Sequence, residues 1–210
     1  MDKKSFISQF DRTDIRVESS TRVYDGFFKV DEVVLKHALF AGGESEPVKR
    51  ELLERGDAVA ILPYDPKTNR LIFIEQLRIG AYRSSASPWL LEVIAGMIDK
   101  PESAEEVAIR EAEEEAGLTI ERLVPMLNYL SSPGGTTERL YLFLGVVDSE
   151  GAGGIFGLPQ EQEDIKVHVI DFDESMALLQ QGIIDNAATV ICLQWLALNK
   201  GRIDSELEVC

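Results

Sequence analysis

The sequence predicts an α/β protein in which a mixed sheet lies between helices, preceded by a small antiparallel β domain. Strand-like apolar runs and helical segments follow one another without strict alternation along the 210 residues. This order favours an α/β sandwich with a mixed sheet over a doubly wound parallel sheet. A polar, glycine-bearing stretch at 41–47 separates the first strands from the rest. We therefore predict two domains, 1–48 and 49–210.

The individual elements follow from apolar spacing and turn residues. Two strands within 22–40 form the N-terminal β domain. A hairpin comes next, because 58–62 and 71–77 flank the turn-rich segment 63–69. Beside a central helix, treated below, the apolar runs predict strands at 89–94, 124–130, 140–147 and 165–170 and helices at 173–181 and 187–199.

Charge and composition exclude several classes of partner. The formal net charge of −16 argues against nucleic acid and anionic lipid, because phosphate backbones are bound by basic surfaces. Two cysteines make neither a disulfide framework nor a metal-ligand spacing. No apolar run reaches signal-peptide or membrane-span length, so we expect a soluble, cytoplasmic protein.

A central helix is predicted over 104–116. Ser103 and Glu106 form a capping-box pattern, and Gly117 stands where a left-handed C-cap would end the helix. Alanines recur every four residues from Ala104 to Ala116, and this small-residue stripe lets a helix lie close against a sheet.

The same helix carries an unusual density of carboxylates. Glu111 and Glu115 lie four residues apart on one face, where like charges repel, and the acidic side chains crowd the C-terminal half, where the helix dipole favours cations. A solvated acidic surface is one interpretation. A bound divalent cation is the other, because it would reverse the sign of the repulsion.

The surrounding residues favour the cation. Gly96, Glu102, Arg110-Glu111, Glu114-Glu115 and Gly117 follow the order and spacing of the Nudix box, and the segment resembles that family at every defining position, with Ala112 smaller than the usual aliphatic residue. The resemblance implies a Nudix α/β/α sandwich with Mg²⁺ as cofactor. It implies metal ligation by Glu111, Glu115 and the carbonyl of Ala95, a further or water-mediated ligand in Glu114, and an orienting role for Arg110. Mn²⁺ can replace Mg²⁺ on such oxygen ligands.

A wider match concerns the substrate. Pro133 resembles a marker of bacterial ADP-ribose pyrophosphatases, although the same residues also suit an ordinary turn. Further segments around Tyr24–Phe28, Glu75–Arg78 and Asp185–Ala188 extend this resemblance over nearly the whole chain. It implies a homodimer that exchanges the N-terminal domain, and substrate contacts from Phe27, Arg50, Arg78, Met97 and Glu138. Phe27 would stack on adenine, or else serve as a core or interface aromatic.

A glycine-rich segment at 150–163 is long for a loop, and such loops are usually functional lids or disordered. By position Glu161 resembles the catalytic base of the family and Glu163 its remaining metal ligand; the alternative is a solvent-exposed acidic loop. The expected reaction is Mg²⁺-dependent hydrolysis of ADP-ribose to AMP and ribose 5-phosphate. Two other functions stay open: hydrolysis of another nucleotide sugar such as GDP-mannose, and a non-catalytic nucleotide-binding module.

Overall fold

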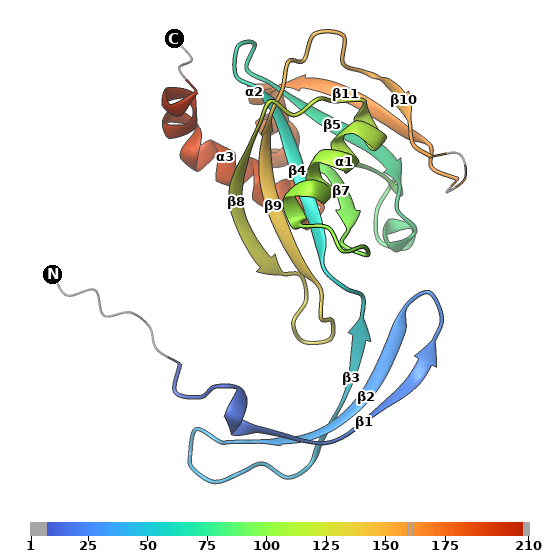
Figure 1. Ribbon diagram of the computed structural model, residues 1–210, viewed down its shortest axis with the longest axis vertical. Coiled ribbons are helices and arrows are strands. Elements are labelled where there is room, and N and C mark those ends of the chain that lie inside the picture. The colour runs from blue at the N-terminus through green and yellow to red at the C-terminus, as the bar shows by residue number, and fades with distance from the viewer. Residues whose placement is uncertain (1–7, 159, 161, 208–210) are drawn as a thin grey trace, which may run out of the picture. The chain divides into compact units, whose positions relative to one another are not determined.

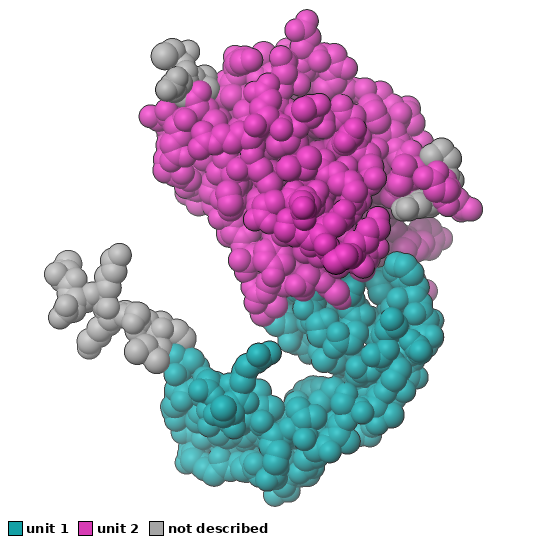
Figure 2. Space-filling model, viewed as in Figure 1, with its two compact units in different colours: residues 1–55, 132–138 teal, residues 56–131, 139–210 magenta. Residues whose placement is uncertain are grey.

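The computed structural model describes residues 8–158, 160 and 162–207, which form two compact units. Figure 2 colours the two units separately. Unit 1 contains the chain up to Arg55 together with Ser132–Glu138, and unit 2 contains Gly56–Ser131 and the chain from Arg139 onward. Within the described ranges, no helix is long and apolar enough to span a membrane.

Unit 1 is an antiparallel sheet, as predicted, but it has three strands instead of the two expected. Its strands lie in the order β1-β2-β3, and their bounds are β1 Ile15–Asp25, β2 Lys29–His37 and β3 Val48–Glu54, after a 3-10 turn η1 Arg12–Asp14. Every residue of β1 is exposed. The segment Ser132–Glu138 joins this unit through Leu53, whose N–H donates to the Gly135 carbonyl at 2.8 Å.

The predicted domain boundary at 48/49 differs from the division between the units, which falls at Arg55/Gly56. The physical reason is β3, a strand that the sequence analysis did not recognise. It pairs along its whole length with β2, from Lys29 opposite Glu54 to Leu35 opposite Val48. The polar stretch at 41–47 therefore connects two strands of one sheet.

Unit 2 is built on a mixed eight-stranded sheet. Its main path runs β10-β11-β5-β4-β9-β8, with β6 paired to β5 and β7 to β4. Only β4 and β9 pair in parallel within the described sheet. The bounds are β4 Ala58–Asp65, β5 Arg70–Leu77, β6 Trp89–Glu92, β7 Ile94–Met97, β8 Arg122–Leu130, β9 Arg139–Val146, β10 Gly154–Phe156 and β11 Ile165–Asp171.

Helices cover both faces of this sheet and confirm the predicted α/β/α sandwich (Figure 1). On one face α1, Ala104–Ala116, buries Val107, Ala108 and Ala112 against the sheet. On the other face lie α2, Phe172–Gln180, and α3, Ala187–Glu206, and α3 buries Cys192, Leu193 and Leu196. A short 3-10 turn, η2 Ile79–Ala81, follows β5.

Helix α1 has the predicted ends. The Ser103 hydroxyl accepts from the Glu106 N–H at 3.2 Å while the Glu106 carboxylate accepts from the Ser103 N–H at 2.8 Å. Gly117 ends the helix in the left-handed conformation with φ 64°, and a Cβ added there would collide with the Phe156 ring.

Three other predictions needed correction. The segment predicted as a long loop contains β10, which pairs with β11 and places Phe156 against the core beside α1. The run 89–94 is two strands, β6 and β7, which meet at Val93 because the Val93 N–H donates to the Thr189 hydroxyl at 2.9 Å instead of to a strand. Helix α3 extends to Glu206 instead of ending at 199.

Two glycine-to-alanine changes test these helix assignments. Gly117→Ala should lower the free energy of unfolding by roughly 1–3 kcal/mol, because alanine disfavours the left-handed conformation and its methyl group displaces Phe156. Gly201→Ala is the matched control: it lies in α3 with open space around it, so alanine should raise the stability by about 0.5–1 kcal/mol. Urea unfolding measures both, and equal effects would contradict the C-cap assignment.

Candidate active site

Three predicted metal ligands come together on one face of unit 2. Glu111 and Glu115 project from α1, and Glu163 lies two residues before β11. The charge of Glu163 raises the pKa of both Glu111 and Glu115, so the three carboxylates act on one another electrostatically.

Glu115 is the most buried of the three. Only 4% of it is exposed, and its Oε2 accepts a hydrogen bond from the Ala95 N–H in β7 at 3.3 Å. Burial raises the pKa of Glu115 to about 8, the charge of Glu111 adds to this, and the Ala95 hydrogen bond opposes it. Burial therefore disfavours the ionised form of Glu115, and a cation bound beside it would favour that form.

Glu111 is held between β7 and Arg110. A Cβ added at Gly96 would collide with the Glu111 carboxylate, so a larger residue there would displace this side chain from its place against β7. Burial raises the pKa of Glu111, and the ion pair with Arg110 opposes that shift. The first glycine of the predicted box thus forms the cradle in which the carboxylate lies.

Arg110 organises the exposed edge of the cluster, as predicted. Its Nη1 donates to Glu111 Oε1 at 2.8 Å and to Glu114 Oε2 at 2.9 Å, and its Nε donates to Glu102 Oε2 at 3.3 Å. Glu114 and Glu102 are therefore both engaged by one guanidinium, which ties the loop before α1 to the helix.

The residues fit a hard divalent cation, although their present orientations do not form a cage. Among the described residues, no three acidic, histidine or cysteine side chains surround a common point. The reason is that each carboxylate has another partner: Arg110 for Glu111, the Ala95 N–H for Glu115, and the Leu158 N–H for Glu163 at 3.2 Å. Carboxylate oxygens are the ligands that hard divalent cations prefer, and these three side chains offer them.

Two predicted substrate residues also belong to unit 2. Arg78 stands at the end of β5, and its Nε donates to Glu92 Oε2 at 2.6 Å. Its charge lowers the pKa of Glu115 against the effect of burial, so Arg78 acts on the carboxylate cluster. Met97 ends β7, directly after Gly96, and is half-buried.

The other predicted substrate residues belong to unit 1. Phe27 is 85% exposed and packs edge-on against Phe28, with 5.0 Å between the ring centres. Arg50 is an exposed residue of β3, whereas Glu138 is buried and pairs with Arg55 at 3.0 Å. Glu161, the predicted base, lies outside the described residues.

The residues that hold Arg78 and the strands β6 and β7 in place were not predicted from the sequence. Glu92 holds Arg78, and the start of α3 anchors the strands that carry Glu92 and Ala95: the Asn186 Nδ2 donates to the Leu91 carbonyl at 2.8 Å, and Thr189 accepts from Val93. Such contacts join residues about 95 positions apart, and no local pattern reveals them.

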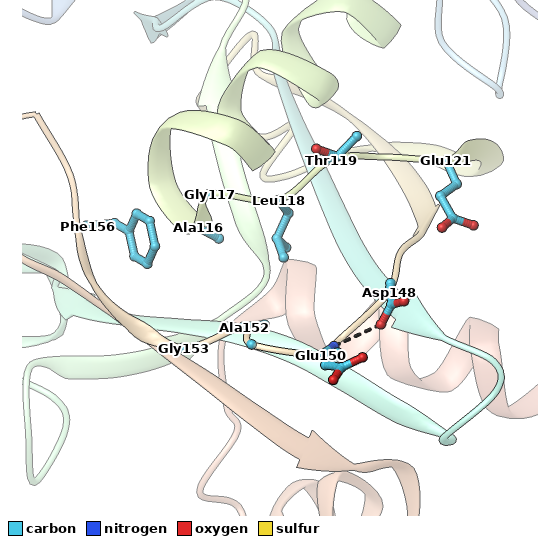
Figure 3. Close-up of a pocket in the computed structure, with 11 residues that line it drawn as sticks. Ala116, Gly117, Leu118, Thr119, Glu121, Asp148, Glu150, Ala152, Gly153 and Phe156 are labelled. Atoms are coloured by element: carbon cyan, nitrogen blue, oxygen red, sulfur yellow. Dashed lines mark hydrogen bonds between the residues drawn. The ribbon is translucent and has the colours of Figure 1, made fainter.

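A separate hollow opens at the C-terminal end of α1 (Figure 3). It has a volume of about 290 Å³, and three of its lining residues are Glu121, Asp148 and Glu150. This volume is at the lower limit for a small-molecule pocket, and the acidic lining disfavours a phosphorylated ligand. The lining includes none of the three carboxylates above, so the hollow is separate from their cluster.

The site thus has a buried Glu115 and a partly buried Glu111 on a capped helix, with Gly96 beside Glu111, and a comparison with protein families agrees with this arrangement. Residues 54–191 match the model described as NUDIX domain, and the chain belongs to the Nudix family. Two similar proteins are ADP-ribose pyrophosphatases. The one from Escherichia coli (strain K12) is 47% identical over 197 residues, with 94% of each chain covered. The one from Haemophilus influenzae is 48% identical over 202 residues, covering 95% of this chain and 93% of the relative.

More distant similarities are consistent with this result. A GDP-mannose pyrophosphatase from Cronobacter sakazakii is 35% identical over 169 residues, covering 77% of this chain and 84% of the relative. A crystal structure of an ADP compounds hydrolase superposes with a TM-score of 0.69 at 22% identity, over 90% of this chain and 95% of that one. At that identity the structural match supports the fold alone.

The raised pKa of Glu115 predicts how stability depends on pH in metal-free protein. Between about 4.5 and about 8 the folded state keeps a proton that the unfolded chain has released. The folded state then binds more protons, so the free energy of unfolding should fall as the pH rises through this window. Mg²⁺ should raise the melting temperature more at pH 8 than at pH 5, since it replaces the proton.

Thermal unfolding with EDTA and with Mg²⁺ at both pH values measures this effect. Glu115→Gln should flatten the metal-free pH dependence, whereas Glu113→Gln, an exposed residue of the same helix, should retain it. A wild-type protein that is equally stable at pH 5 and pH 8 without metal would contradict the assignment.

Proposed function

We propose that the chain is an ADP-ribose pyrophosphatase, which hydrolyses ADP-ribose to AMP and ribose 5-phosphate with Mg²⁺. The observation that carries the proposal is the buried Glu115 beside the partly buried Glu111, which lies against Gly96, in a chain that is similar over nearly its full length to ADP-ribose pyrophosphatases. Mn²⁺ suits the same oxygen donors.

A diphosphate repels a nucleophile with its negative charge, and the bound metal would neutralise that charge and acidify a water molecule. The chain's own residues have distinct tasks. Glu111, Glu115, Glu163 and the Ala95 carbonyl hold the metal, while Arg110 keeps Glu111 and Glu114 in place. Arg78, fixed by Glu92, presents its free guanidinium nitrogens to a phosphate.

The remaining roles belong to the same proposal. Glu161 takes the proton from the attacking water, and Phe27, Arg50, Met97 and Glu138 bind the nucleotide. Exposed apolar side chains on unit 1, namely Val17, Val23, Tyr24 and Phe27, support a homodimer, which the mass of the chain in solution tests directly. We also propose a cytoplasmic location, a nucleotide sugar as the small-molecule partner, and no nucleic acid or membrane partner.

Two alternative functions share features with this proposal. A GDP-mannose pyrophosphatase would use the same metal site, and the 35% identity to such an enzyme makes GDP-mannose the competing substrate to test. A binding module without activity would not need Glu111 and Glu115 both intact beside the Gly96 cradle.

The first experiment is a substrate panel of ADP-ribose, GDP-mannose, NADH and a diadenosine polyphosphate. We expect AMP and ribose 5-phosphate from ADP-ribose with Mg²⁺, and no release with EDTA. Metal-dependent hydrolysis of GDP-mannose in preference to ADP-ribose would support the metal-dependent reaction but identify GDP-mannose as the substrate. No hydrolysis of any compound in the panel would favour the non-catalytic binding module.

Two substitutions separate the base from the metal site. Glu161→Gln should lower kcat roughly 10²–10⁴-fold while metal binding persists, because only proton removal is lost. Glu115→Gln should abolish both turnover and metal binding. Glu150→Gln, an acidic residue of the preceding loop, is the control and should retain wild-type kcat. A Glu161→Gln enzyme with wild-type kcat would remove Glu161 from the mechanism and leave the metal site standing.

A further inference from the structure

Gln76 is a buried polar residue to which neither the family box nor the proposed mechanism gives a role. It lies near the end of β5 and is 8% exposed. Among the described residues, its Nε2 is the one buried side-chain nitrogen or oxygen atom without a hydrogen-bond partner. Leaving such a donor unpaired costs about 1–3 kcal/mol, so a native protein retains one for a reason.

The position of Gln76 on β5 shows which face it occupies. Side chains alternate along a strand, and Ile72 and Ile74 pack in the core beneath α1, whereas Phe73 packs on the α3 side. Pairing with β6 is regular from Ile74 to Leu77 and continues where the Arg78 N–H donates to the Pro88 carbonyl at 2.8 Å. Gln76 therefore shares the α1 face with Ile74.

The residue opposite Gln76 on that face is Leu90 of β6, and Glu92 of β6 lies opposite Ile74. Arg78, the next residue on the same face, donates to Glu92, and three residues after Glu92 the Ala95 N–H donates to Glu115. On the other side β11 pairs with β5 through Lys166 opposite Glu75, and Glu163 lies three residues before Lys166. Gln76 thus stands between the core beneath α1 and the end of the sheet where the carboxylates gather.

The proposed metal site offers acceptors for the N–H of the Gln76 side chain. Ionised carboxylates, phosphate oxygens and the oxygen of metal-bound water all accept hydrogen bonds. Exchanging the carboxamide nitrogen and oxygen by rotation would still leave a polar atom unpaired at this place, since Gln76 has no side-chain hydrogen bond in the described structure. Glu111, Glu115 and Glu163 are all turned to other donors.

We propose that Gln76 is a positioning residue of the metal site. Its carboxamide N–H donates a hydrogen bond to an oxygen atom that coordinates the divalent cation. That oxygen belongs to a carboxylate rotated onto the metal or to metal-bound water. The inference rests on the metal site of the proposed function and is independent of which nucleotide is cleaved. Within the described residues of the metal-free structure, Gln76 Nε2 has no hydrogen-bond partner, and it gains one when the metal binds.

The test compares wild type with Gln76→Met, which fills a similar volume without polar atoms. Calorimetric titration with Mn²⁺ alone should show binding weakened about tenfold or more, the loss typical of one hydrogen bond to a charged acceptor. In EDTA the variant should melt roughly 2–4 °C higher than wild type, because an unpaired donor has been removed. A residue with a purely structural role would not shift stability and metal affinity in opposite directions.

Glu75→Met is the matched control, since Glu75 precedes Gln76, faces the other side of the sheet and pairs with His168 at 2.8 Å. Its Mn²⁺ affinity should equal that of wild type. If Gln76→Met does not fold, Gln76→Leu takes its place in the same titration. Mn²⁺ affinity within twofold of wild type in the folded variant would overturn the proposal.

Wild-type turnover separates this inference from the proposed function. Wild-type hydrolysis of ADP-ribose combined with unchanged Mn²⁺ binding in Gln76→Met refutes the role of Gln76 alone. If the wild type does not hydrolyse ADP-ribose but Gln76→Met still binds Mn²⁺ more weakly than the wild type, the role of Gln76 is supported. The same result refutes ADP-ribose as the substrate.

Discussion

Glu115 lies on the inward side of α1, where a carboxylate is costly unless a cation compensates it. The helix around it follows from this position: small alanines bring α1 close to the sheet, the capping box and Gly117 set its ends, and Gly96 leaves room for the second carboxylate. Burial that would be costly in a structural helix keeps water away from Glu115, the proposed metal ligand, and strengthens its electrostatic interactions.

Arg110 stabilises the arrangement in the absence of metal. It engages Glu102, Glu111 and Glu114 together, and it partly neutralises a helix that carries only this one basic residue. The interaction leaves Glu115 without a cation of its own, because its polar contact is the Ala95 N–H. Glu115, the most buried carboxylate of the cluster, is therefore the one that a bound cation would stabilise most.

Local sequence predicted what depends on local physics. The cap residues of α1, its alanine stripe and the hairpin of β4 and β5 all follow from spacings of a few residues. The third strand of unit 1 was missed because Val48–Glu54 mixes charged and apolar residues and is recognised only by its pairing with β2. β10 was missed because Gly154–Phe156 is three residues long amid glycines. Gln76 carried one readable signal, a polar residue at an inward position of an apolar strand, but its meaning depends on long-range neighbours.

The tethers from the start of α3 to β6 and β7 link the site to the end of the chain. The Asn186 amide and the Thr189 hydroxyl hold the backbone at Leu91 and Val93, on either side of Glu92. The carboxylate helix is synthesised near the middle of the chain, but the residues that fix the strand beneath it come some 70 positions later. During translation, these two hydrogen bonds therefore form only after the start of α3 has left the ribosome, and until then the backbone on either side of Glu92 lacks them.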